Sequence, residues 1–238
     1  MKKQFMRIEP EYNNVSIVLV GSLNAAIFHP SWFVANNILT NVDIENAEVE
    51  IIHRDIAIFK VGDWLRIQVE PNRFIAETTE PPFVRLHDLV VRTFREALVH
   101  TPINKLGINR LVHFGVGDEE TRDKIGKKLA PQEAWGEWAS DIAGTGKNKR
   151  GGMVSLSMRQ NGGDDREIGY IEAKIEPSPL IKNRAGIMIN VNDHYEIPKD
   201  DSLAGPIPIM DILEKQFDKS IRRSEWIIDQ IMDLKGKV

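Results

Sequence analysis

The chain has 238 residues, of which 42% are hydrophobic and 28% charged, and its formal net charge is −4. These values are ordinary for a globular protein, and a chain of this length can bury roughly 70% of its unfolded surface. Cysteine is absent, which excludes disulfides, thiolate metal sites, iron–sulfur clusters and a cysteine nucleophile, and the acidic net charge gives no overall attraction to nucleic acids.

The N-terminal residues 1–7 are basic, but no apolar segment of signal-peptide length follows them. The longest apolar run nearby, residues 17–20, has the length of a strand. No segment approaches the roughly 20 apolar residues needed to cross a bilayer. We therefore expect a cytoplasmic protein that makes no contact with a membrane.

The first half is expected to combine an antiparallel meander of short strands with two helices. A short helix over 31–39 follows Pro30, whose missing N–H costs nothing in a first helical turn. Pro81 and Pro82 open a longer helix whose apolar residues fall on one face, and Pro102 follows it. The expected strands are residues 15–20, 48–52, 56–60, 64–69 and 74–78.

The second half shows a similar order of elements. Its first helix has acidic residues in the first turn and lysines near the end, as the helix macrodipole favours. Its last helix has a long apolar stripe, including Phe217, Ile221 and Ile228, that should pack on the sheet of this half. The expected helices are residues 117–128, 131–138 and 208–234. The expected strands are residues 106–114, 153–159, 168–175 and 186–191.

Two segments of the chain are alike. Residues 64–71 and 170–177 each open on an aromatic, alternate apolar and polar residues, and end in an aliphatic-Glu-Pro step. Such alternation is typical of a half-buried strand, which proline ends. We predict an α+β fold of two similar lobes, residues 1–102 and 103–238, each an antiparallel sheet with a closing helix packed on one face. This β-α-β-β-β-β-α order is similar to the repeat of the TATA-binding-protein-like fold.

A glycine-rich basic segment spans residues 140–152. It departs from the Walker pattern, because Asp141 stands where a glycine is needed and Asn148 where a serine or threonine would hold magnesium. Cations on such a segment could instead grip phosphates, so a nucleic-acid-binding protein is one alternative function. The residues that would carry it are Lys147, Lys149, Arg150 and Arg159, with nearby Trp138.

Glu172 and Lys174 form a Glu-x-Lys step in an expected strand, with Asp164 and Asp165 in the turn before it. Metal-dependent nucleases use such carboxylates to hold the ion and such a lysine to orient water, which gives a second alternative. The simpler interpretation is that both residues line the solvent-facing side of a sheet, since composition alone produces about one such step. The histidines lack the spacing of a zinc helix, so we expect no metal site and no cofactor.

The tryptophans are expected to be largely buried, as this residue usually is. Trp135 and Trp138, three residues apart, should anchor their helix to the core. A binding face is the alternative for this pair, because tryptophan is enriched at interface hot spots. Trp32, Phe33 and Trp226 are also expected in the core.

The stretch 64–74, a following amphipathic helix and residues 106–109 are together similar to a pattern in a sporadically distributed, uncharacterised family of bacterial proteins of about 250 residues. The resemblance implies a bacterial or phage-derived protein, plausibly carried on mobile elements, and brings no catalytic residue with it. Since no motif indicates a reaction, our leading hypothesis is a non-enzymatic interaction module. It would bind a partner protein in a multi-component bacterial system.

Overall fold

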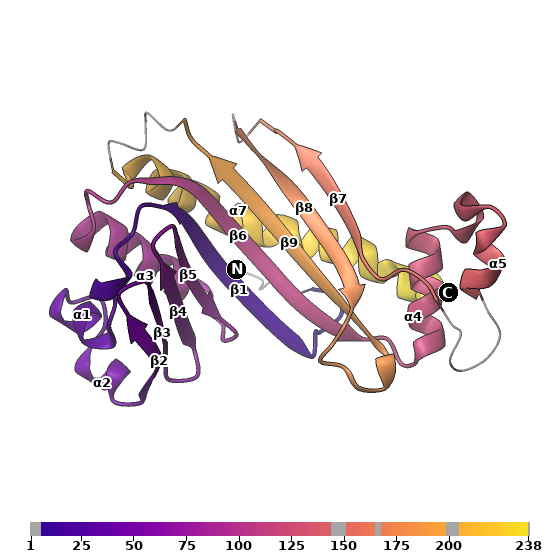
Figure 1. Ribbon diagram of the computed structural model, residues 1–238, viewed down its shortest axis with the longest axis horizontal. Coiled ribbons are helices and arrows are strands. Elements are labelled where there is room, and N and C mark those ends of the chain that lie inside the picture. Colours follow the sequence, from indigo (N-terminus) through magenta and orange to yellow (C-terminus); the bar gives the residue numbers. More distant parts are fainter. Residues whose placement is uncertain (1–5, 144–150, 165–167, 199–204, 238) are drawn as a thin grey trace.

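The computed structural model describes residues 6–143, 151–164, 168–198 and 205–237, and the chain folds around one antiparallel sheet (Figure 1). The strand order is β2-β3-β4-β5-β1-β6-β9-β8-β7. The strands are β1 (Tyr12–Gly21), β2 (Ala47–His53), β3 (Ile56–Val61), β4 (Leu65–Glu70), β5 (Arg73–Thr78), β6 (Ile103–Gly115), β7 (Leu156–Asn161), β8 (Ile168–Pro177) and β9 (Gly186–Glu196).

The helices connect these strands or close the halves of the chain. Short 3-10 turns also occur at Ala25–Ile27 and Lys182–Arg184, and at the C-terminus, Asp233–Lys237. The described α-helices are α1 (Pro30–Ala35), α2 (Asn41–Ile44), α3 (Val84–Arg92), α4 (Glu119–Leu129), α5 (Trp138–Ala143) and α7 (Ile207–Met232). A π-helical turn, Thr93–Ala97, continues α3, and a 3-10 turn, Gln132–Trp135, precedes α5. No helix in the described ranges is both long and apolar enough to cross a membrane.

The expected α+β class is confirmed, but the strands form one sheet instead of two separate ones. The join is the pairing of β1 with β6, which runs from Tyr12 opposite His113 to Gly21 opposite Ile103. Both strands are long and apolar on one side, and an unpaired edge of this kind would favour aggregation. Pairing the two inner edges with each other removes that exposure.

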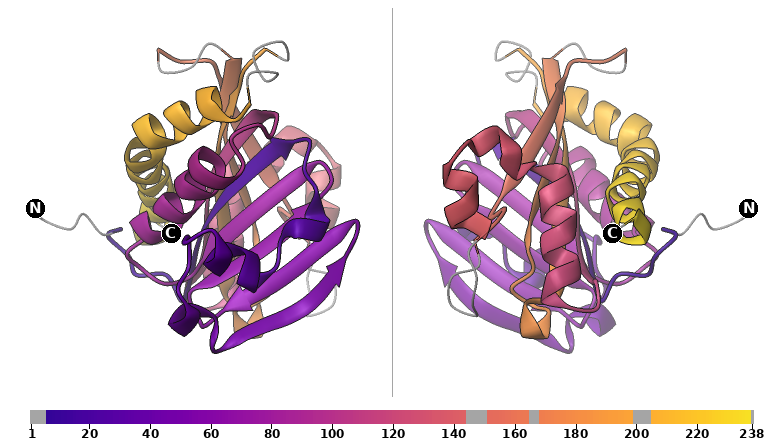
Figure 2. Two further views of the ribbon diagram at one scale, coloured as in Figure 1. Left: turned by 90° about the vertical axis from the view of Figure 1, so that its left-hand side faces the viewer. Right: turned by 90° about the vertical axis from the view of Figure 1, so that its right-hand side faces the viewer.

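Alternating side chains divide the sheet into a buried face and an accessible face. Ile17, Phe59, Ile67 and Phe74 have no exposed surface and belong to a core that α3 and the first part of α7 cover. A smaller core around Ile189 is covered by α4 and the last turns of α7. Figure 2 shows α3 and α7 together on one side of the strands.

The final helix behaves differently from expectation in one respect. Phe217 is buried as expected, but it packs in the core of the first half together with Leu213, and Ile221 lies against the same core. Ile228 and Met232 are buried in the core of the second half. The helix therefore packs on both halves of the sheet, because it is long enough for one apolar stripe to cross the join between β1 and β6.

Candidate functional site

The face of the sheet opposite α3 and α7, here called the open face, carries the polar side chains of the strands. Cross-strand partners point to the same face, so the pairing register identifies its residues. One row crosses all nine strands without interruption. Its members, from edge to edge, are Glu48, Lys60, Arg66, Glu77, Ser16, Asn109, Asn192, Glu172 and Arg159.

Every lysine and arginine that the strands present on the open face lies beside a carboxylate. Arg66 is 3.1 Å from Glu77 and 3.4 Å from Glu50, and its guanidinium holds the pKa of Glu50 below the ordinary value. Arg159 lies 2.6 Å from Glu172. The remaining pairs are Lys60–Glu50, Arg73–Glu70, Lys105–Glu196 and Lys174–Glu176. The open face is therefore balanced in charge.

The middle of the open face is formed by asparagines from β6 and β9. The side-chain oxygens of Asn190 and Asn192 are shielded from solvent and accept no hydrogen bond from the described residues. Gly107 lies beside them, where a β-carbon would come within 3.2 Å of the Asn192 oxygen. Both oxygens are therefore unsatisfied acceptors inside the face, which neighbouring atoms cover.

Aliphatic side chains form a second row on the open face, over the first half of the sheet. Val18 pairs with Ile75, and the same row continues through Gln68 and Ile58 to Ile51 at the edge. Val18, Ile58 and Ile75 are half-buried, and Ile51 is exposed. Gln68 separates the pair Val18–Ile75 from the pair Ile58–Ile51. Exposed apolar positions that gather on an otherwise polar face are a common mark of contact with another protein.

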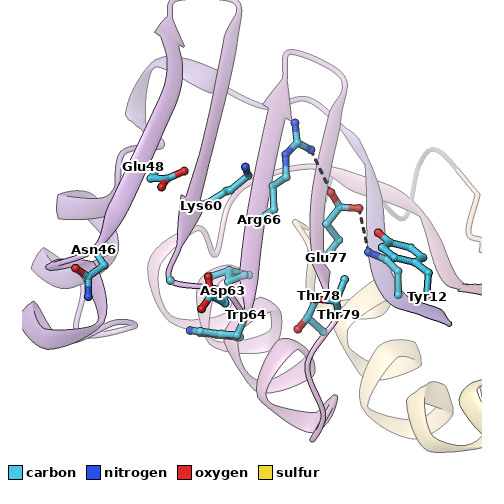
Figure 3. A pocket seen from close by; sticks show the side chains of 13 residues that line it. Tyr12, Asn46, Glu48, Lys60, Asp63, Trp64, Arg66, Glu77, Thr78 and Thr79 are labelled. Carbon is cyan, nitrogen blue, oxygen red and sulfur yellow. Dashed lines mark hydrogen bonds and ion pairs between the residues drawn. The ribbon is translucent and has the colours of Figure 1, made fainter. Parts of the chain in front are cut away.

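A cavity of about 550 Å³ opens near one end of this face, between β1 and the β2 edge (Figure 3). Glu48 and Asp63 line it and have no ion-pair partner among the described residues, whereas its Lys60 and Arg66 are paired. Burial and then the charge of Glu77 raise the pKa of Tyr12. The residues that line the cavity are Tyr12, Asn14, Asn46, Glu48, Lys60, Gly62, Asp63, Trp64, Leu65, Arg66, Glu77, Thr78 and Thr79.

The residues proposed for nucleic-acid binding do not form one described patch. Lys147, Lys149 and Arg150 lie outside the described residues. Arg159 is on the open face, where its guanidinium is paired with Glu172 and lies 3.9 Å over the ring of Tyr170. Trp138 begins α5, which lies beyond the β7 edge of the sheet (Figure 1).

The expected core position of the tryptophan pair is wrong. Trp135 is 55% exposed and Trp138 58% exposed, and their rings meet edge to face at 5.7 Å. Trp226 is also exposed, on the outer side of α7, whereas Phe33 is buried and Trp32 packs against the core as expected. Trp135 ends the 3-10 turn and Trp138 begins α5, so the pair does not lie on one helix. The two rings pack on each other and leave more than half of their surface to solvent.

The residues proposed for a nuclease centre point along the open face and are already paired. Glu172 accepts hydrogen bonds from Arg159, and the ammonium of Lys174 lies 2.7 Å from Glu176. Within the described part of the chain, no three histidine, aspartate or glutamate side chains gather where they could share a metal ion. The geometry therefore favours the simpler interpretation, in which these residues line the accessible side of a sheet.

Sequence reasoning did not identify the asparagines or the cavity. The polar positions of each strand follow from period-two alternation, but the register that aligns them across strands does not. Comparison of the chain with protein-family models and with curated proteins returns no match. What the open face can bind is therefore inferred from its own residues: paired charges, an aliphatic row and a cavity with two acids that are unpaired among the described residues.

Proposed function

We propose that the chain is a protein-interaction module whose open face docks a partner protein, in a multi-component bacterial system. The observation that carries the proposal is the balanced charge of this face beside its aliphatic row, Val18, Ile58 and Ile75. Protein–protein interfaces combine apolar contacts with polar and charged ones, and this face offers both side by side.

The same pairing disfavours a nucleic-acid partner on the open face. Binding to a phosphate backbone depends on cations that replace condensed counterions. Arg66 and Arg159 would first have to leave Glu77 and Glu172, and the freed carboxylates would repel the phosphates. Nucleic-acid binding through Lys147, Lys149 and Arg150 remains the alternative function, and it is tested separately below.

The two-lobe repeat expected from the sequence is part of the proposal. In each half, the first strand pairs with the last strand of the same half: β1 with β5 and β6 with β9. In each half a helix that follows the last strand, α3 or α7, packs on the covered face. A repeated unit of this kind supports the proposal, since joining two copies edge to edge doubles the width of the docking surface.

The test uses a photo-crosslinking amino acid in place of Val18, at the centre of the open face, in cells that contain the natural partner. The matched control places it at Trp226, an exposed apolar residue on the helical side of the sheet. We expect one stoichiometric protein adduct from position 18 and none from position 226. A Val18→Arg variant should bind that protein roughly 30-fold more weakly, as loss of a hot spot of about 2 kcal/mol implies.

Three outcomes would contradict the proposal. Adducts only from position 226 would place the partner on α7, and no protein adduct from either position would leave the open face without a partner. Adducts to nucleic acid, with binding that weakens steeply as salt is added, would favour the alternative. In that case charge reversal of Lys147, Lys149 and Arg150 should abolish binding.

A further inference from the structure

One edge of the sheet is open to a further strand. β2 ends the strand order and, within the described part of the chain, pairs on one side only, with β3. Nearly all of its side chains are exposed, including Val49, Ile51 and Ile52. A free edge with exposed aliphatic residues can receive a strand from another chain, because its outer N–H and C=O groups have no partner in the sheet.

The two sides of β2 differ in chemistry. Glu48 pairs with Lys60 across the ladder, which places it on the open face, and Glu50 contacts Arg66 there. Val49 pairs with Phe59 and Ile52 with Ala57, and both partners are buried on the covered face. Successive residues of an added strand point to opposite faces. Such a strand would therefore meet the carboxylates of Glu48 and Glu50, together with Ile51, on one side and aliphatic surface on the other.

The cavity lies directly beside this edge, since Asn46 and Glu48 line it from the start of β2 (Figure 3). Its unpaired charges are the carboxylates of Glu48 and Asp63, because its lysine and arginine are paired. Two carboxylates that line a cavity of this size suit the ammonium or guanidinium of a long side chain. The ring of Trp64 lines the same cavity, and Arg85 already lies 4.1 Å over that ring.

We propose that β2 binds an extended segment of the partner protein as an added strand, and that a lysine or arginine of this segment enters the cavity toward Glu48 and Asp63. This inference rests on the proposed function and specifies the chemistry of the partner: cationic residues alternating with aliphatic ones. A second copy of the chain is the less suitable occupant. Antiparallel pairing of two β2 strands about Val49 would set Glu48 of each copy against Glu50 of the other, and like charges directly opposite destabilise a pair.

The test is a fluorescence anisotropy titration of the full-length protein with a labelled eight-residue peptide of alternating lysine and valine. Two further peptides carry the controls: one alternates glutamate and valine, and one keeps the lysines but has N-methylated backbone amides on alternate residues. We expect saturable binding of the first peptide only. N-methylation removes the donors that pair with an edge strand and leaves the side chains unchanged.

Protein variants locate the site. Glu48→Gln combined with Asp63→Asn should weaken binding of the lysine peptide about tenfold or more, as loss of charge-assisted hydrogen bonds implies. The matched control, Glu120→Gln with Asp218→Asn, removes the same charges from exposed positions on α4 and α7 and should bind like the parent. Thermal unfolding of both variants verifies that they fold.

Equal binding of the lysine and glutamate peptides, full binding of the N-methylated peptide, or equal loss in both double variants would each overturn the inference. Concentration-dependent dimerisation that Val49→Lys abolishes would assign the edge to a second copy instead. These results are independent of the crosslinking at position 18. A partner captured there, together with no peptide binding at β2, would leave the proposed function standing and remove only the inference about the edge.

Discussion

Arg110 of β6 and Glu225 of α7 form an ion pair across the interface between sheet and helix, with nitrogen and oxygen 3.8 Å apart. Arg110 is only 2% exposed, donates hydrogen bonds to the Asn13 side chain and the Asn14 carbonyl, and lies 5.0 Å over the ring of Phe83. Burial lowers the pKa of Arg110 to about 10 and raises the pKa of Glu225. Both shifts oppose charge, so the loss of hydration outweighs the attraction between the two groups.

This balance predicts that removing one partner of the ion pair lowers the stability of the protein more than replacing both partners with apolar residues. Glu225→Ala leaves a buried guanidinium without its carboxylate and should lower the free energy of unfolding by about 3 kcal/mol. The double variant Arg110→Met, Glu225→Leu should lose less than the single one, because apolar side chains of similar volume need no hydration. Urea unfolding of the three proteins tests this. A double variant less stable than Glu225→Ala would show that the pair itself stabilises the fold.

Stability should depend on pH through His113 and His194. Burial lowers the pKa of both below the ordinary 6.5, and the carboxylate of Glu196 only partly offsets this for His194. The ring of His113 lies 2.7 Å from the Ser178 hydroxyl inside the protein. The unfolded chain therefore takes up protons more readily, and stability should fall as the pH drops from about 6.5 toward the lowered values.

The measurement is the free energy of unfolding at pH 7.0 and at pH 5.5. His113→Gln should reduce the difference between the two values, at some cost in stability at pH 7.0. The control His53→Gln replaces a histidine that is mostly exposed in the β2–β3 turn and should leave the difference unchanged. An unchanged difference in both variants would show that carboxylates, and not these histidines, set the dependence on pH.

The local structure of the chain was predictable because it follows from side-chain alternation. The expected strand 56–60 is β3, 64–69 is β4 and 74–78 is β5, each within one residue at either end. Their inward residues, such as Phe59, Ile67 and Phe74, are buried because period two places them on one face. The final helix, expected at residues 208–234 from its apolar stripe, is α7 at Ile207–Met232.

The pairing of distant segments was not predictable. β1 and β6 belong to one sheet because their edges pair with each other. The alternation of side chains within a strand does not show which other strand it will pair with. Arg110 lies on the buried face of β6 and pairs with Glu225 of α7. Nothing in the sequence around either residue indicates that the two will meet. The row from Glu48 to Arg159 depends on the same registers, so its charge balance appears only in the folded chain.

The exposed tryptophan pair leads to a prediction about stability. Trp135→Ala combined with Trp138→Ala should change the free energy of unfolding of the whole protein by less than about 1 kcal/mol, since surface substitutions cost little. The comparison is Phe33→Ala, which removes a fully buried ring and should cost about 3 to 5 kcal/mol. Urea unfolding measures both. A loss in the tryptophan variant as large as that of Phe33→Ala would restore the expected core role of the pair.

The charge balance of the open face can be tested by disturbing it. Glu77→Gln and Glu172→Gln together would leave Arg66 with Glu50 as its one remaining carboxylate and would leave the guanidinium of Arg159 free. If pairing is what keeps phosphates away, the double variant should gain affinity for a generic DNA duplex. Its affinity should also decrease more steeply with salt, by a slope of about 0.9 for each phosphate contacted.

The control for this comparison is Glu133→Gln with Glu137→Gln, which changes the net charge equally at two exposed carboxylates that form no ion pair with the described residues. The parent and the control should show the same weak binding in a filter-binding assay between 50 and 200 mM salt, roughly the range over which phosphate contacts lose their strength. Equal gains in the two double variants would mean that net charge alone governs DNA binding. Strong binding by the parent itself would instead favour the cations of the glycine-rich segment, Lys147, Lys149 and Arg150.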